Sequence, residues 1–91
     1  MDLEYEIRMS DEALKHIAYF KYIADKALIN KIERLLYELK MHPRTGTGQC
    51  EQLKYDLKGF WSRRINREHR LIYQIDEKRH IVYIYKLRGH Y

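Results

Sequence analysis

The stretch GFWSRRINREHRLIYQIDEKRHIVYIYKL, residues 59–87, sets the class of fold. It contains three segments, residues 60–65, 69–75 and 80–87, that are rich in aromatic and β-branched side chains, which is typical of β-strands. Only three and four polar residues separate these segments, and links this short join neighbouring strands that run in opposite directions. The second half of the chain therefore predicts an antiparallel meander.

Two further strands and a loop are predicted upstream of this meander. Apolar and polar residues alternate over residues 53–57, as in a strand with one buried face. Residues 43–49, PRTGTGQ, have turn-forming composition and no periodicity, which indicates a loop. The same alternation over residues 3–9 predicts an N-terminal strand.

Between the N-terminal strand and that loop, the period of apolar residues becomes that of helices. Ser10 is a good N-cap, acidic residues follow it, and apolar residues recur on one face, so a first helix is predicted over residues 11–24. Asp25 offers a second N-cap, and Pro43 ends the second helix by forcing the residue before it out of helical geometry. The apolar stripe of the second helix is formed by Leu28, Ile32, Leu35 and Leu39. The predicted fold class is α+β: a single domain, residues 1–91, in which an N-terminal strand and a two-helix hairpin pack on one face of an antiparallel sheet.

Charge is unevenly distributed along the chain. Residues 1–41 contain seven Lys or Arg against eight Asp or Glu, whereas residues 42–91 contain eleven against five, so the second half supplies all of the net charge of +5. This asymmetry is typical of a surface that attracts a polyanion such as nucleic acid, although an ordinary solvated surface has the same composition. With a single cysteine, Cys50, and no apolar run long enough to span a membrane, we expect a cytoplasmic protein.

Two arginines are predicted to face each other across the hairpin of residues 60–75. Pairing Arg63 with Leu71 places Arg64 opposite Arg70. Like charges that face each other across a ladder repel. The pair therefore indicates either an anionic ligand such as phosphate or two long side chains that splay apart into solvent.

Glu51 is a carboxylate at the end of the glycine-containing loop, among basic residues. It is suited either to act as a base or to neutralise its neighbours in a surface ion pair. A base, cations and an acid are together what RNA cleavage by an internal 2′-hydroxyl requires, and that route needs no metal. Neither a metal site nor a cofactor is predicted, because the histidines have no ligand spacing: they are His16, His42, His69, His80 and His90.

Several runs of the sequence resemble one family of bacterial toxins. GFWSRRI at residues 59–65, EHRLIY at residues 68–73 and the terminal His90-Tyr91 closely resemble the YoeB/Txe branch of the RelE superfamily, and the likeness covers nearly the whole chain. The resemblance implies a RelE-like fold and a toxin of a type II toxin–antitoxin pair. Such a toxin is a metal-independent endoribonuclease that cleaves mRNA in the ribosomal A site, leaving a 2′,3′-cyclic phosphate and a 5′-hydroxyl.

The resemblance also implies roles for individual residues. Glu51 matches the general base, Arg70 the arginine that stabilises the transition state, and His90 the general acid, with Tyr91 beside it as an alternative proton donor. Three basic residues match positions that hold either the phosphate backbone or stretches of ribosomal RNA: Lys54, Arg63 and Arg64. The implied partners are a cognate antitoxin, the ribosome and mRNA, and a homodimer is left open.

Two alternatives to the nuclease are compatible with the sequence. One is a non-catalytic toxin of the same fold, such as one that poisons DNA gyrase, although such a protein has no need of an acid and a base. The other is a basic RNA-binding module that stacks bases on Phe60, Trp61 and Tyr73. The strand pattern opposes the second alternative, because it turns Trp61 and Tyr73 toward the helices.

Overall fold

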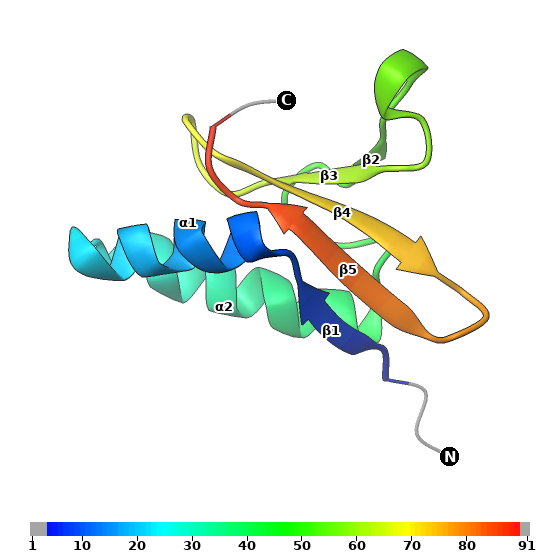
Figure 1. Cartoon of the computed structure of the whole chain (residues 1–91), viewed down its shortest axis with the longest axis horizontal. Helices are drawn as coiled ribbons and strands as arrows, with labels where there is room; N and C mark the ends of the chain where they lie inside the picture. Colours follow the sequence, from blue (N-terminus) through cyan, green and yellow to red (C-terminus); the bar gives the residue numbers. More distant parts are fainter. Residues whose placement is uncertain (1–3, 90–91) are drawn as a thin grey trace.

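The computed structural model describes residues 4–89, which form two helices and a five-stranded sheet (Figure 1). The helices α1 and α2 lie side by side on one face of the sheet, and the other face is left uncovered by helices (Figure 1). In chain order the elements are β1 (Glu6–Met9), α1 (Asp11–Tyr22), α2 (Lys26–Met41), β2 (Glu51–Gln52), the 3₁₀-helix η1 (Tyr55–Leu57), β3 (Trp61–Arg64), β4 (Arg70–Asp76) and β5 (Ile81–Lys86).

The sheet is mixed and not antiparallel throughout, which corrects the prediction. Its strand order is β1-β5-β4-β3-β2, and β1 pairs parallel to β5 while the other three pairs are antiparallel. Short links fix the relative directions of β3, β4 and β5. The strand β1 reaches the sheet through two helices, so no short link determines its direction. The α+β class and the meander of β3, β4 and β5 are confirmed.

Both predicted helix caps are present. The Ser10 Oγ accepts a hydrogen bond from the Ala13 N–H at 3.0 Å, and the Asp25 Oδ1 accepts one from the Leu28 N–H at 3.1 Å. The first helix ends at Tyr22, two residues earlier than predicted, because Ala24 adopts a left-handed conformation with φ of 55°. The four leucine and isoleucine residues of the predicted stripe on α2 are buried against the sheet.

The prediction of a strand over residues 53–57 is wrong. Only Glu51 and Gln52 pair with β3, and residues 55–57 form the 3₁₀-helix η1. The Tyr55 side chain is 91% exposed, so the alternation of apolar residues in this segment did not mark a buried face. Within residues 4–89, neither helix is long and apolar enough to cross a membrane.

Candidate active site

Glu51 and Arg70 are brought together on the sheet face that the helices leave uncovered. Glu51 in β2 pairs with Ser62 in β3, and Arg70 begins β4 on the other side of β3. The Arg70 Nε donates a hydrogen bond of 2.5 Å to the Ser62 Oγ, and the Arg70 Nη2 lies 3.5 Å from the Glu51 Oε1. The Arg70 side chain is only 12% exposed, whereas that of Glu51 is 50% exposed. A largely buried cation beside an accessible carboxylate can bind and activate a phosphodiester.

Ser62 is a residue of this site that the sequence did not single out. It is fully buried, and its hydroxyl orients the Arg70 guanidinium from the strand between Arg70 and Glu51. A signal was available, because Ser62 lies two residues before Arg64 and therefore shares its face of the strand. A serine hydroxyl on the same face as two arginines can accept a hydrogen bond from a guanidinium group, which has only donors.

The loop between α2 and β2 delivers Glu51 to this position. The Gly48 carbonyl accepts a hydrogen bond of 2.6 Å from the Arg64 N–H, which places the loop against β3. Gly48 has φ of +92°, and a Cβ added to it would lie 2.7 Å from the Arg64 carbonyl oxygen. Only glycine allows this close approach. The position of Glu51 therefore depends on Gly48.

Arg63 is buried, which corrects its predicted role in RNA binding. Its side chain is 0% exposed and points to the helix side of the sheet, where its Nη1 donates a hydrogen bond of 2.9 Å to the Glu38 Oε1. The guanidinium also donates hydrogen bonds to the Tyr73 hydroxyl and to the carbonyls of His42, Thr45 and Thr47. Arg63 therefore fixes the loop that carries Glu51 and is not available to RNA.

Tyr73 reinforces the same loop from the neighbouring strand. Its hydroxyl donates a hydrogen bond of 2.6 Å to the Pro43 carbonyl. Burial raises the pKa of the Tyr73 hydroxyl well above its usual range, so the hydroxyl remains a donor. Tyr73 is fully buried and Trp61 is packed against the core, so these aromatic rings are not a free stacking surface.

The other two predicted RNA-binding residues, Arg64 and Lys54, are exposed. Arg64 pairs with Arg70 across β3 and β4, in the predicted register. Its Nε donates a weak hydrogen bond of 3.4 Å to the Asn66 carbonyl. Lys54 lies between β2 and η1 and lines a shallow pocket together with Glu51. The two cations therefore flank Glu51 and Arg70.

Aromatic side chains extend the uncovered face beyond Arg70. The Phe60 and Tyr85 rings lie 5.5 Å apart, and Tyr83 and Tyr85 are 41% and 40% exposed. Exposed rings of this kind can stack on nucleic-acid bases. Phe60 was a candidate for this role from the sequence, whereas the two tyrosines of β5 were missed.

His90 and Tyr91 lie outside the described residues, so their predicted roles stay predictions. The last described residue, Gly89, accepts a hydrogen bond of 3.0 Å at its carbonyl from the Arg70 N–H. The described chain therefore ends beside Arg70, one peptide bond before His90. Among residues 4–89, no three His, Cys, Asp or Glu side chains gather into a metal-binding group.

Comparisons with a family model and with known proteins indicate the same family. The model of the family described as "YoeB-like toxin of bacterial type II toxin-antitoxin system" matches residues 9–91. The chain is 40% identical over 68 residues to Toxin YoeB of Escherichia coli strain K12, covering 75% of this chain and 80% of that protein.

Solved structures of similar proteins agree in fold. The YoeB dimer from Staphylococcus aureus superposes with a TM-score of 0.84 at 36% identity, covering 97% of this chain and 99% of that one. A YoeB–YefM complex from the same organism gives a TM-score of 0.82 at 35% identity, covering 96% and 98%. The predicted RelE-like architecture is thereby confirmed.

Proposed function

Because the chain belongs to the family of YoeB-like toxins of bacterial type II toxin–antitoxin systems, we propose that it is an endoribonuclease that cleaves mRNA in the ribosomal A site. The observation that carries this proposal is the pairing of an accessible carboxylate, Glu51, with the largely buried Arg70 guanidinium on one uncovered sheet face.

The proposed reaction is a transfer of the phosphodiester to the neighbouring 2′-oxygen. The Glu51 carboxylate takes the proton of the 2′-hydroxyl, and the 2′-oxygen attacks the adjacent phosphorus. Arg70 stabilises the negative charge that develops on the phosphorane oxygens. The bond from phosphorus to the 5′-oxygen then breaks, and the leaving oxygen takes a proton from the acid, assigned to His90 or Tyr91. The products are a 2′,3′-cyclic phosphate and a 5′-hydroxyl.

The remaining residues of the uncovered face suit the binding of the substrate. Arg64 and Lys54 are exposed cations on either side of the reacting groups and can contact phosphates. Phe60 and Tyr85 offer rings on which a base can stack. None of these side chains needs to take part in proton transfer.

The proposed partners are a cognate antitoxin, the ribosome and mRNA. In the Staphylococcus aureus complex a YoeB toxin is bound to YefM, and by analogy we expect this toxin to bind an antitoxin of its own. The excess of positive charge in residues 42–91 favours an antitoxin segment that is acidic. A homodimer is also proposed, by analogy with the YoeB dimer.

The proposed function is tested on purified ribosomes programmed with a defined message. Wild-type protein should cleave the message in the A site, and both Glu51→Gln and Arg70→Met should lower the single-turnover rate at least about 100-fold, as for loss of a general base or a charge-stabilising donor. Glu33→Gln, on an exposed position of α2, is the matched control and should cleave like wild type.

Two outcomes would contradict this proposal. Cleavage at the wild-type rate by both Glu51→Gln and Arg70→Met would contradict the roles assigned to these residues. Binding of wild-type protein to ribosomes without any cleavage would instead favour the non-catalytic toxin or the RNA-binding module.

A further inference from the structure

Residues 87–89, which we term the C-terminal segment, follow β5 and are held by two imidazoles. The N–H groups of Leu87 and Arg88 donate to the Nδ1 of His16 at 3.1 and 3.2 Å. The N–H of Gly89 donates to the Nδ1 of His69 at 2.9 Å. Three consecutive backbone N–H groups therefore donate to imidazoles, two of them to His16 in α1 and one to His69 just before β4.

These hydrogen bonds define the protonation state and the tautomer of both imidazole rings. An imidazole nitrogen accepts a hydrogen bond only when it carries no proton, so His16 and His69 are neutral with the proton on Nε2. The His16 Nε2 lies 3.5 Å from the Glu12 Oε2, an acceptor suited to that proton. A protonated ring would instead turn an N–H toward the backbone N–H groups, and the contact would become repulsive.

The surroundings of His16 favour its neutral form. Burial lowers the pKa of the His16 imidazole, and the nearby charges of Arg88 and Lys86 lower it further. A positive charge on the neighbouring His69 ring would act in the same direction. Among residues 4–89, Glu12 acts in the opposite direction and raises the pKa of His16. Glu12 belongs to α1, Lys86 is the last residue of β5, Arg88 follows β5, and His69 precedes β4.

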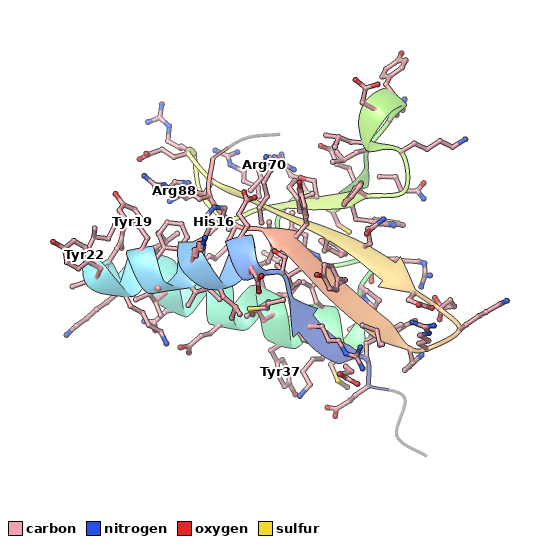
Figure 2. All side chains as sticks on the ribbon, in the orientation of Figure 1. His16, Tyr19, Tyr22, Tyr37, Arg70 and Arg88 are labelled. Atoms are coloured by element: carbon pink, nitrogen blue, oxygen red, sulfur yellow. The ribbon has the colours of Figure 1, made fainter. Side chains whose placement is uncertain are left out.

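Side-chain packing also holds the C-terminal segment against α1. Leu87 is fully buried, and the Arg88 guanidinium lies 3.8 Å from the centroid of the Tyr19 ring. Figure 2 shows Arg88, Tyr19 and His16 gathered at the same side of α1, with Arg70 beside them. The His69 ring in turn lies 5.1 Å from the Phe20 ring of α1.

We propose that His16 and His69 are positioning residues that hold the C-terminal segment, whose Gly89 carbonyl accepts the Arg70 N–H, and thereby keep Arg70 in place for the reaction. The contribution to cleavage rests on the proposed function, whereas the anchoring of residues 87–89 does not. Neither imidazole is assigned a contact with substrate. Their role is to accept the backbone N–H groups that the end of β5 leaves without a strand partner, since β5 ends at Lys86.

The first test measures anchoring without any cleavage assay. Wild-type protein labelled with ¹⁵N is titrated from pH 8 to pH 5, and the imidazole and backbone amide signals are followed by NMR. The amide signals of Leu87 and Arg88 should shift together with the imidazole signals of His16, and the amide signal of Gly89 together with the imidazole signals of His69. Amides that do not follow these rings, or rings that carry their proton on Nδ1, would overturn the proposal.

The second test separates positioning from folding and from substrate binding. Phenylalanine keeps the size of the ring but removes the acceptor, whereas glutamine retains a neutral acceptor. The double variant His16→Phe/His69→Phe should lower the single-turnover cleavage rate at saturation at least tenfold, with little change in the concentration that half-saturates the ribosomes. The double variant His16→Gln/His69→Gln should recover most of that rate. His42→Gln, at an exposed histidine just after α2, is the matched control.

The outcomes distinguish this inference from the proposed function. Wild-type cleavage that is fully retained in the folded double phenylalanine variant would overturn positioning. Equal losses in the phenylalanine and glutamine variants would also overturn it, because the acceptor would then not matter. A wild-type protein that does not cleave would contradict the proposed function alone, and the amide titration would still decide whether the imidazoles anchor the segment.

Discussion

Arg63 is a buried charge that organises the proposed active site without contacting Glu51 or Arg70 in any of its five hydrogen bonds. Its three nitrogens donate five hydrogen bonds to a carboxylate, a hydroxyl and three carbonyls, so the guanidinium is compensated inside the protein. Three of the acceptors are carbonyls of residues 42–47, at the start of the loop that ends at Glu51. The stability of the fold and the position of the proposed base therefore depend on the same side chain.

Replacing Arg63 should be costly. Arg63→Met leaves those carbonyls and Glu38 without their donor, and we expect a loss of about 3 kcal/mol in the free energy of unfolding. Glu38 is 31% exposed, so water can compensate part of its charge. Urea denaturation measures the loss, and Arg64→Met is the control, which should change stability by no more than about 0.5 kcal/mol. Similar losses in the two variants would contradict the structural role assigned to Arg63.

The carboxyl of Glu38 should make stability depend on pH. Burial by itself raises the pKa of Glu38, but hydrogen bonds from Thr47 and the charge of Arg63 outweigh it, and the net pKa lies below the unfolded value of 4.5. A lowered pKa in the folded state contributes stability above pH 4.5 that is lost as the pH falls through the folded value.

The variant Glu38→Gln removes this titration. Wild type should be more stable than Glu38→Gln at pH 7, and the difference should shrink as the pH falls below 4.5. Urea denaturation at a series of pH values measures it. A difference that stays constant down to about pH 3 would show that Glu38 does not supply the effect.

For individual residues, the sequence predicted strand register better than it predicted the functional role of each side chain. The register that sets Arg64 opposite Arg70 follows from a three-residue link and the alternation of faces, and it is confirmed. The role of Arg63 was missed because its partner Glu38 lies 25 positions earlier in the chain and its other acceptors are mainly backbone carbonyls, which carry no signal in a sequence. The roles of His90 and Tyr91 rest on the family resemblance.

Among the elements, the loop from Pro43 to Cys50 does most to build the site. It crosses from the helical layer to the edge of the sheet and has to approach β3 closely enough for Gly48 to accept from Arg64. Gly46 and Gly48 both have positive φ, and a Cβ at Gly46 would meet the side chains of Glu38 and Arg63. The loop that carries the proposed base can therefore follow this path because Gly46 and Gly48 have no side chains.

Gly48→Ala tests this role of the loop. A Cβ would strain the left-handed backbone and press on the Arg64 carbonyl, so we expect a loss of about 2 kcal/mol in stability and a lower cleavage rate. Gly59→Ala is the matched control, because Gly59 has a similar φ of +98° but no atom within 4 Å of the added Cβ. The difference between the two variants in urea denaturation isolates the contact, and equal losses would contradict it.

Elements were predictable where a regular period or a cap marked them. Both helices and their caps were predicted because Ser10 and Asp25 precede clear apolar stripes. The segment of residues 53–57 alternates in the same way as a strand, yet its aromatic residue is exposed and the segment turns into a 3₁₀-helix. Alternation over five residues is too short to distinguish these cases.

Over the whole molecule, the two halves of the chain differ in net charge and in the elements that they supply. The first half supplies β1 and the helices and has a net charge of −1, whereas the second half supplies the other strands and has a net charge of +6. The proposed catalytic residues Glu51 and Arg70 and the exposed cations Lys54 and Arg64 all belong to the second half. The direction of β1 was not predictable, because it is set by packing of the helix pair and not by a short link.

We propose that this fold positions Glu51 and Arg70 so that a 2′-hydroxyl of the message attacks the adjacent phosphodiester. The most direct measurement compares two messages on programmed ribosomes, identical except that one carries a 2′-deoxynucleotide on the 5′ side of the cleaved bond. We expect cleavage of the all-ribose message, with a 2′,3′-cyclic phosphate end, and no cleavage of the substituted message at that bond. Cleavage of both messages at the same bond would contradict the claim.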